Sequence, residues 1–315
     1  MSSNKQRAAV IGAGLIGKSW AIVFARAGWE VTLYDSNSAV LAAAPAEIER
    51  QVAIMQDAGM LQQGEQLLAN ISLQADLSVA VTKVDYVQEC GPEDLEIKQE
   101  LFATMDRFAD TETVLASSTS AIVTSSFTGN LTGRGRMLVV HPVNPPHLVP
   151  LVEISPAEWT DPAVVDRARE IMQALGQTPI LVRQEIDGFI LNRLQAALLN
   201  EAVRLVDGGY VSAEDLDKTV ADGLGLRWSF MGPFETIDLN APAGVRDYAA
   251  RYSPFFERIV ESQSTVPDWS GAAIDNIDNY CRSLLSLDEI PVKSEWRDRK
   301  LALLRSHKRQ VSKDD

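Results

Sequence analysis

Cysteine and histidine are scarce in this sequence. Among its 315 residues there are two cysteines and three histidines. Cys90 and Cys281 are far apart in the chain, and neither has the CxxC or Cys/His spacing of a metal site. The sequence therefore indicates neither a disulfide framework nor a metal centre, and no metal cofactor is expected.

Basic residues and long hydrophobic runs are also in short supply. Asp and Glu total 43 against 29 Lys and Arg, a formal net charge of −14, and such a surface repels polyanions. No apolar stretch approaches the roughly 20 residues that span a bilayer. The start MSSNKQR leads into a short apolar segment rather than the hydrophobic region of a signal peptide. We therefore expect no nucleic-acid partner, no membrane association and a cytoplasmic location.

Apolar residues are plentiful and follow two different patterns. They make up 46% of the chain, whose length is typical of roughly two domains. Up to Ile186, short apolar runs alternate with helical periodicity, which predicts an α/β fold with a mostly parallel, doubly wound Rossmann-type sheet. Only helical patterns follow, one of them expected to begin at Pro254. We place the domain boundary at Asp187-Gly188, with a Rossmann-type domain at residues 1–187 and an all-helical domain at 188–315. The expected strands lie at residues 8–11, 31–34, 86–89, 114–117, 137–141, 149–154 and 180–182.

The segment VIGAGLIG contains the pattern G-x-G-x-x-G between the first expected strand and helix. Gly12 suits a tight turn, Gly14 lets a pyrophosphate approach the backbone, and Gly17 lets helix and strand pack closely. Asp35 ends the second expected strand, where a carboxylate can bind a ribose 2′-hydroxyl, and no arginine directly follows it to bind a 2′-phosphate. These features predict NAD rather than NADP. The alternative is that the glycines serve only the turn and the acid is merely solvated.

Two of the three histidines lie in HPVNPPHLVPLVE, which runs from His141 to Glu153. His141 ends an expected strand, where α/β sheets gather ligand chemistry, and imidazole has the near-neutral pKa needed to take a proton from a substrate hydroxyl. If the next strand runs beside the first, Glu153 comes level with this histidine and can fix its tautomer. Alternatively, the histidine is a structural residue and the glutamate a buried acid neutralised by an arginine. His147 is expected on the exposed loop.

Polar side chains also follow other apolar segments. The run SSTSA at residues 117–121 comes directly after an expected strand, in a position to bind a substrate oxygen, although such runs also cap helices or form turns. In GFILNRLQ, Asn192 and Arg193 lie early in an apolar helix at the domain boundary. They can face a cleft and touch the substrate, or face solvent from an amphipathic helix.

Taken together, four ordered motifs resemble the 3-hydroxyacyl-CoA dehydrogenase superfamily, and more closely its lambda-crystallin branch, the L-gulonate 3-dehydrogenases. The resemblance extends from Ala8 to about Arg299. It implies an NAD-dependent oxidoreductase with a Rossmann-type domain, and a homodimer formed through the helical domain. The motifs are VIGAGLIGKSWA, HPVNPPHLVPLVE, GFILNRLQ and GLGLRWSFMGPFET.

Matched position by position, the resemblance implies a set of site residues. His141 corresponds to the family's catalytic histidine and Glu153 to its partner. Ser120 and Asn192 correspond to the residues that hold the substrate oxygen. The NAD contacts, with the residues of the glycine turn, are Gly12, Gly14, Leu15, Ile16, Gly17, Asp35, Glu93, Lys98 and Ser118. The second glutamate and the lysine of that set can also be read as an ordinary surface pair at a helix start.

One segment departs from the acyl-CoA branch of the family. Where those enzymes resemble G-Y-P-M-G-P-F-E, this chain reads GLGLRWSFMGPFE, which contains Arg227, Trp228 and Phe230. An arginine offered to the cleft suits a substrate with a free carboxylate, because its planar fork binds a carboxylate bidentately. The alternative is a surface arginine beside core aromatics. The same segment suits a quaternary ammonium, since carnitine dehydrogenases are similar in this stretch.

These features predict an NAD-dependent dehydrogenase that oxidises the 3-hydroxyl of a small free hydroxy acid, with His141 as general base. The leading candidate reaction converts L-gulonate to 3-dehydro-L-gulonate. Oxidation of a 3-hydroxyacyl-CoA, such as 3-hydroxybutyryl-CoA, or of L-carnitine is the alternative within the same chemistry. A dinucleotide-binding structural protein without turnover is the alternative from another class.

Overall fold

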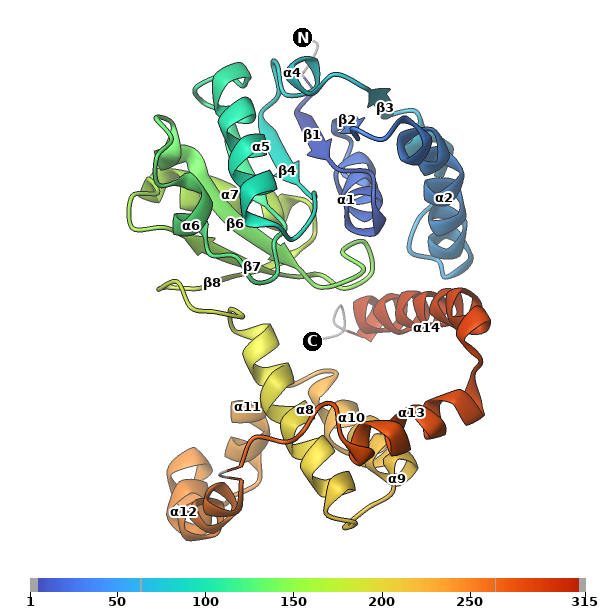
Figure 1. The fold of residues 1–315 in the computed structure, drawn as a ribbon, viewed down its shortest axis with the longest axis vertical. Helices are drawn as coiled ribbons and strands as arrows, with labels where there is room; N and C mark the ends of the chain where they lie inside the picture. The colour runs from blue at the N-terminus through green and yellow to red at the C-terminus, as the bar shows by residue number, and fades with distance from the viewer. Residues whose placement is uncertain (1–4, 63, 264, 312–315) are drawn as a thin grey trace. The chain divides into compact units, whose positions relative to one another are not determined.

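The computed structural model describes residues 5–62, 64–263 and 265–311. The chain forms two compact units (Figure 1), one with the residues up to Asn192 and those from Glu295 onward, the other with Arg193–Ser294. Helices α8 (Leu191–Asp207) and α14 (Ile290–Val311) have residues in both units. The sequence pattern predicts that the helical domain includes the whole C-terminal stretch, whereas most of α14 groups with the first unit. Within the described residues, no helix is both long and apolar enough to cross a membrane.

The first unit is built on one sheet with the strand order β3-β2-β1-β4-β5-β6-β7-β8. Neighbouring strands are parallel except for β6 and β7, which are antiparallel. Strands β2 and β3 lie on one side of β1, and β4 to β8 lie on the other, which is the expected doubly wound arrangement. The strands are β1 (Arg7–Ile11), β2 (Glu30–Tyr34), β3 (Ile71–Gln74), β4 (Tyr86–Glu89), β5 (Val114–Ser117), β6 (Met137–Pro142), β7 (Leu151–Pro156) and β8 (Thr178–Leu181).

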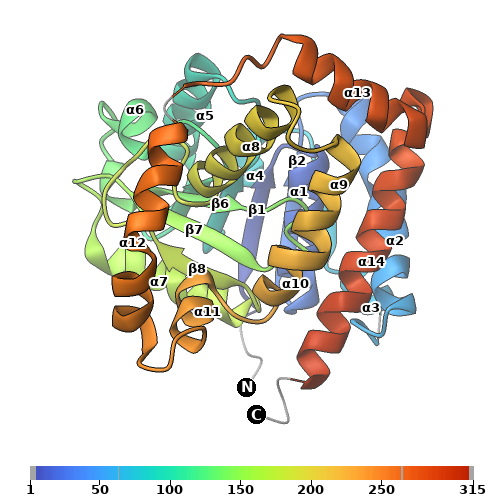
Figure 2. The same cartoon turned by 90° about the horizontal axis from the view of Figure 1, so that it is seen from below.

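Helices cover both faces of this sheet. Besides α8 and α14, the helices of the unit are α1 (Leu15–Arg26), α2 (Ser38–Asp57), α3 (Gly64–Leu68), α4 (Leu77–Ala80), α5 (Leu95–Phe108), α6 (Thr124–Thr128), the 3₁₀ turn η1 (Arg134–Arg136) and α7 (Pro162–Ala174). Alternate strand residues point to opposite faces. On β6, Leu138 and Val140 therefore join a core with residues of α1, α2, α7 and α14, while Met137 and Val139 join a core with residues of α4, α5 and α6. In Figure 2, α14 lies in front of α2, and Ala302 of α14 belongs to the same core as residues of α2.

The described residues of the second unit form helices joined by loops, so the expected α/β unit followed by a helical one is confirmed. After α8 come α9 (Ala213–Lys218), the π-helical segment η2 (Thr219–Leu224), α10 (Gly225–Trp228), α11 (Pro233–Leu239), α12 (Gly244–Ser262), α13 (Ala272–Leu284) and the 3₁₀ turn η3 (Leu287–Glu289). The expected helix start at Pro254 is wrong, because α12 runs through this proline. A proline inside a helix removes one backbone hydrogen bond, and α12, which has no buried residue, leaves the freed carbonyl accessible to water.

Candidate active site

The glycine turn joins β1 to α1 as predicted. Gly12 has a left-handed backbone with φ +108°, and a Cβ there would lie 2.6 Å from the carbonyl oxygen of Cys90. A Cβ on Gly17 would lie 1.7 Å from the carbonyl oxygen of Gly12, so only glycine permits this approach of helix and turn. Gly14 directly precedes α1 and has open space where a side chain would be. The exposed N-terminus of α1 behind this open glycine fits a pyrophosphate.

A cavity of about 490 Å³ lies beside the turn, where β1, β2 and β4 end. Asp35 lies at the edge of this cavity. Its two carboxylate oxygens accept hydrogen bonds from the N–H groups of Ala13 and Asn37, each at 2.8 Å, and these bonds fix the side chain. Leu15 and Ile16 follow in the first turn of α1. None of the described lining residues is Lys or Arg, so the cavity suits an unphosphorylated ribose. The lining consists of Ile11, Gly12, Gly14, Tyr34, Asp35, Ser36, Val40, Cys90, Gly91, Pro92, Ile97 and Leu101.

Glu93 holds the polar loop that follows β5. Its carboxylate accepts hydrogen bonds from the Thr119 hydroxyl and from the N–H groups of Ser120 and Ala121. Burial raises the pKa of Glu93, but these hydrogen bonds and a nearby lysine outweigh burial, so the pKa is lowered and the carboxylate is ionised at neutral pH. The implied NAD contact of this residue stays a prediction. The geometry shows an acid that fixes the loop carrying the expected substrate-oxygen serine.

Lys98 is buried, so the reading of it as part of a surface pair is wrong. Its ammonium lies 3.1 and 3.0 Å from the two oxygens of Glu89, and the two side chains are 1% and 0% exposed. The Ser117 hydroxyl and the Gly91 N–H donate to the same carboxylate, at 2.5 and 2.6 Å. The buried charges are thus paired and hydrogen-bonded. Sequence reasoning missed this pair because a single glutamate at a strand end does not reveal its partner.

Two serines of the loop after β5 have different surroundings. The Ser118 hydroxyl accepts hydrogen bonds from Trp20 Nε1 at 3.1 Å and from Gln88 Nε2 at 2.7 Å, and its NAD contact stays a prediction. Ser120 is exposed, and its carbonyl oxygen accepts a hydrogen bond from Asn192 Nδ2 at 2.9 Å. The fold therefore brings together the two residues expected to hold the substrate oxygen.

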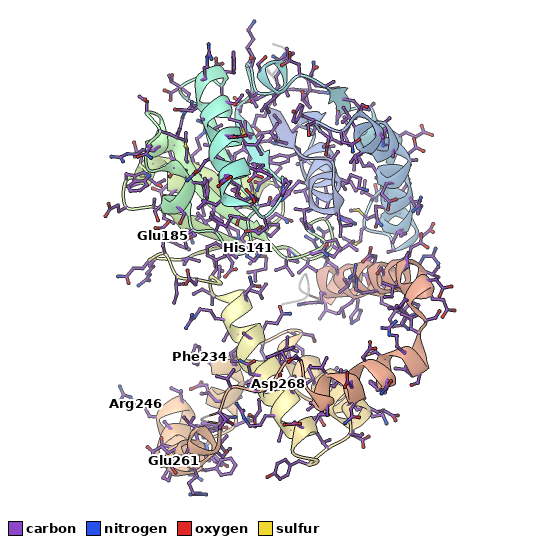
Figure 3. The ribbon with its side chains drawn as sticks, viewed as in Figure 1. His141, Glu185, Phe234, Arg246, Glu261 and Asp268 are labelled. Atoms are coloured by element: carbon purple, nitrogen blue, oxygen red, sulfur yellow. The ribbon has the colours of Figure 1, made fainter. Side chains whose placement is uncertain are left out.

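The antiparallel pairing of β6 and β7 places His141 directly opposite Glu153. Nδ1 of the imidazole lies 2.8 Å from Oε2 of the carboxylate, with the histidine 6% exposed and the glutamate fully buried. Figure 3 shows His141 near the edge of the sheet where β6 ends. The pair that the sequence spacing allows is therefore present, and it arises from strand register.

The second carboxylate oxygen of Glu153 binds the start of α8. Oε1 accepts the N–H groups of Ile190 and Leu191 at 2.9 and 3.0 Å, so the acid satisfies amides that a helix N-terminus leaves unpaired. Burial raises the pKa of Glu153, but the hydrogen bonds from the imidazole and the two amides outweigh burial, and the pKa is lowered. The ionised carboxylate accepts a hydrogen bond from the Nδ1–H group of His141, and in this tautomer the ring's free lone pair is on Nε2.

Phe189 is a site residue that sequence reasoning missed. It is fully buried, and its ring centroid lies 5.4 Å from that of His141 with the planes tilted by 37°. Gly188 and Phe189 have left-handed backbones with φ of +75° and +48°, the latter uncommon for a bulky residue. Together they form the turn before the two amides that bind Glu153. Gly188 indicates a turn in the sequence, but no sequence feature predicts that the phenylalanine after it adopts a left-handed backbone.

The expected exposure of His147 is wrong, since this residue is 1% exposed. Its Nε2 lies 3.2 Å from Gln51 Oε1, and its carbonyl oxygen accepts hydrogen bonds from Arg26 and Arg305. Its neighbour Leu148 is apolar and 2% exposed, which draws the loop between β6 and β7 onto the core. The proline-rich loop is therefore packed inward.

Arg227 lies on α10 in the second unit and is exposed. Trp228 and Phe230 are 42% and 69% exposed, so the reading of them as core aromatics is wrong. The contact of Arg227 with a substrate carboxylate stays a prediction.

Comparisons with known proteins show the family of this chain. Residues 7–186 match the family described as 3-hydroxyacyl-CoA dehydrogenase, NAD binding domain, and residues 188–267 match its C-terminal domain. The chain is 41% identical to lambda-crystallin of Oryctolagus cuniculus over 307 residues, 96% of each chain. It is 34% identical to L-carnitine dehydrogenase of Burkholderia mallei over 270 residues, 85% of this chain and 83% of that one. The solved structure of 5-formyl-3-hydroxy-2-methylpyridine 4-carboxylic acid 5-dehydrogenase, an NAD⁺-dependent dismutase, matches with a TM-score of 0.79 and 27% identity, covering 96% of this chain and 97% of that one.

Proposed function

Because the chain belongs to the 3-hydroxyacyl-CoA dehydrogenase family, we propose that it catalyses the NAD-dependent oxidation of the 3-hydroxyl group of a small free hydroxy acid. L-gulonate, converted to 3-dehydro-L-gulonate, is the first candidate substrate. The observation that carries the proposal is the buried His141–Glu153 pair, 2.8 Å apart, near the end of β6 in a unit with an NAD-binding domain.

The residues beside β1 and β2 fit the cofactor that the family binds. The glycine turn leaves the N-terminus of α1 open to a pyrophosphate, and Asp35 is fixed where it can accept a hydrogen bond from a ribose hydroxyl. NAD supplies the hydride acceptor when bound.

His141 is the proposed general base. Its Nδ1 is committed to Glu153, so Nε2 is the atom that takes the proton of the substrate hydroxyl. The resulting imidazolium is stabilised by the ionised carboxylate, whose lowered pKa keeps it charged at neutral pH. The same carboxylate fixes the orientation of the ring before the proton arrives.

Ser120 and Asn192 are proposed to hold the substrate oxygen. The hydrogen bond from the Asn192 amide to the Ser120 carbonyl joins the loop after β5 to the start of α8. Donors placed at the oxygen favour the alkoxide character that develops as the proton leaves.

The choice of a free acid rests on Arg227. Its exposed guanidinium can bind a carboxylate through two parallel hydrogen bonds, and a CoA thioester offers no carboxylate beside its hydroxyl. L-carnitine is a second candidate, because exposed Trp228 and Phe230 suit a quaternary ammonium and a relative is named L-carnitine dehydrogenase. A structural protein that binds NAD without turnover remains the alternative from another class.

The test compares initial rates of NAD reduction with L-gulonate, L-3-hydroxybutyrate, L-carnitine and 3-hydroxybutyryl-CoA. Wild type is measured beside Arg227→Ala and a matched control, Arg246→Ala, which removes another exposed arginine of the second unit. We expect the free acids to be preferred. Because a hydrogen bond to a charged group contributes about 1.5–3 kcal/mol, Arg227→Ala should raise KM for them by about tenfold or more. The control should leave KM unchanged.

Other outcomes separate the alternatives. Preference for the CoA thioester, unaffected by Arg227→Ala, would overturn the free-acid assignment. Preference for L-carnitine would favour the second candidate. Tight NAD binding without NADH formation from any substrate would favour the non-catalytic alternative.

A further inference from the structure

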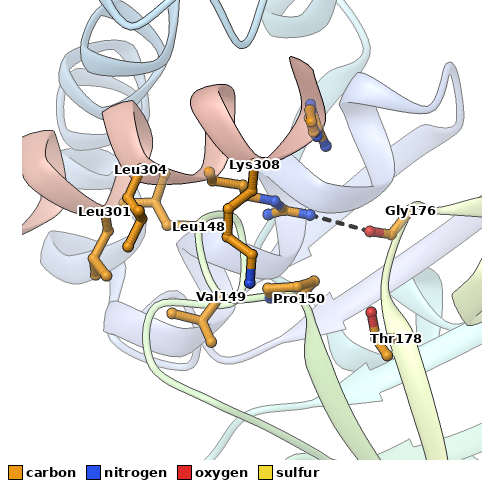
Figure 4. A pocket seen from close by; sticks show the side chains of 10 residues that line it. Leu148, Val149, Pro150, Gly176, Thr178, Leu301, Leu304 and Lys308 are labelled. Carbon is orange, nitrogen blue, oxygen red and sulfur yellow. Dashed lines mark hydrogen bonds between the residues drawn. The ribbon is translucent and has the colours of Figure 1, made fainter. Parts of the chain in front are cut away.

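A second cavity, of about 700 Å³, lies in the first unit (Figure 4). It is formed by the loop between β6 and β7, the start of β8 and the C-terminal half of α14. Its lining shares no residue with the cavity beside the glycine turn. Its volume is within the range of about 300–1,000 Å³ typical of small-molecule sites. The lining residues are Leu148, Val149, Pro150, Gly176, Thr178, Leu301, Leu304, Arg305, Lys308 and Arg309.

The lining has an apolar part and a cationic part. Most of the side chains from the loop and from the middle of α14 are aliphatic, whereas the last two turns of α14 contribute Arg305, Lys308 and Arg309. Three basic residues on one cavity wall are unusual in a chain with a net charge of −14. A ligand that matches both parts needs an anionic head and an apolar body.

The cationic part continues behind the cavity wall. Arg26 of α1 and Arg305 both donate to the carbonyl oxygen of His147, at 2.8 and 2.9 Å. Arg305 also donates to the Gly176 carbonyl at 3.1 Å, the dashed line in Figure 4. Burial, together with the positive charges of neighbouring arginines, Arg309 among them, lowers the pKa of Arg26 to about 9 and that of Arg305 to about 10.

These guanidiniums bind carbonyl and amide oxygens in place of carboxylates. Among the residues that the structure describes, neither Arg26 nor Arg305 forms an ion pair. Burying positive charge without negative charge nearby is costly, and an anion placed at the cavity wall reduces that cost. The cationic cluster therefore indicates an anion site, and the aliphatic lining indicates what is attached to the anion.

We propose that this cavity binds an amphiphilic organic anion with a carboxylate or phosphate head and an unbranched apolar chain of medium length. The head lies at the cationic wall formed by α14, and the chain lies against Leu148, Val149 and Leu304. This site is separate from the proposed reaction and does not depend on it.

The test is calorimetric titration of the full-length protein with octanoate and octyl phosphate. Acetate, which has the head without the chain, and 1-octanol, which has the chain without the charge, are titrated beside them. We expect one saturable site per chain for octanoate or octyl phosphate, with acetate and 1-octanol binding at least about tenfold more weakly. The tighter of the two amphiphiles identifies the head group.

Two adjacent leucines of α14 provide a matched pair of variants. Leu304 lines the cavity and is 46% exposed, whereas Leu303 is 52% exposed and is not part of the lining. Leu304→Asp should weaken binding of the amphiphile by about tenfold or more, because it adds a repelling charge and removes apolar contact, and Leu303→Asp should not. Arg309→Gln should also weaken binding, and it serves as the test if Leu304→Asp does not fold.

Three results would overturn the proposal. One is the absence of saturable binding of either amphiphile to wild type. Another is equal binding by Leu304→Asp and Leu303→Asp, which would place the amphiphile elsewhere, including the substrate site. The third is 1-octanol binding as tightly as octanoate, which would leave the cations without a role. Affinity for NADH, followed by fluorescence, should be the same in all folded variants.

Discussion

At the scale of single residues, one buried carboxylate organises the proposed active site. Glu153 uses Oε2 for the imidazole of His141 and Oε1 for two amides at the start of α8. Phe189 packs against the same imidazole from a left-handed backbone and directly precedes the two residues whose amides bind the carboxylate. Uncommon backbone conformations persist where the surrounding packing over-determines them, as it does here for a fully buried ring.

The role of the imidazole can be tested directly. His141→Ala should lower kcat by about 10²–10⁴-fold, because it removes the base that takes the hydroxyl proton. His307→Ala, which removes an exposed histidine of α14, is the control and should leave kcat unchanged. The measurement is the steady-state rate of NADH formation with the preferred substrate, together with the affinity for NADH, which should not change. Near-normal turnover by His141→Ala would refute the assignment.

At the scale of elements, the strands that carry His141 and Glu153 are joined by a loop that contains a second, buried histidine, His147. Burial, with Arg26 and Arg305 nearby, lowers the pKa of His147 to about 3. The unfolded chain, with an ordinary histidine pKa of about 6.5, binds this proton more readily than the folded protein does. Stability is therefore lost as the pH falls below about 6.5, a loss that continues until about pH 3.

This predicts an acid sensitivity that one substitution should reduce. Between pH 6 and pH 5, the free energy of unfolding of wild type should fall by up to about 1.4 kcal/mol more than that of His147→Gln. Urea unfolding at several pH values measures the difference. His307→Gln should keep the wild-type dependence. Parallel curves for wild type and His147→Gln would show that His147 is protonated in the folded state.

The elements that sequence analysis predicted are those with strong local signals. The turn after β1 is predicted by three glycines. The position of His141 opposite Glu153 is predicted by two apolar strands joined by a short loop. β3 was missed because two of its four residues are exposed, the other two are only partly buried, and the segment lacks an apolar run. The Glu89–Lys98 pair and the inward packing of His147 were missed because both depend on contacts between distant segments, which periodicity does not report.

At the scale of the whole molecule, the second unit presents much apolar surface. α12 has no buried residue, and five of its large apolar or aromatic side chains are between 41% and 65% exposed: Val245, Tyr252, Phe255, Phe256 and Val260. Exposed apolar patches of this kind mark interfaces. A homodimer formed through the helical unit, as the sequence resemblance implies, would cover such a surface.

Light scattering after size-exclusion chromatography tests the dimer. The mass should be twice the 34.5 kDa of one chain. Phe256→Asp should shift the protein toward the single-chain mass, because it introduces a charge into the apolar face of α12. Phe108→Asp, at a residue 41% exposed in the first unit, is the control and should not shift it. A single-chain mass for wild type at micromolar concentration would contradict the prediction.

The carboxylate that binds both an imidazole and the start of α8 has a consequence beyond orientation. A proton on Nε2 draws the negative charge of the carboxylate toward Oε2, whereas the amides draw it toward Oε1. The imidazole and the amides therefore compete for the charge of one carboxylate. By reciprocal linkage, a change in the hydrogen bonds to Oε1 alters the hydrogen bond at Oε2, and a change at Oε2 alters the hydrogen bonds to Oε1. A substitution that disturbs the first turn of α8 should therefore also disturb the contact between the carboxylate and the imidazole.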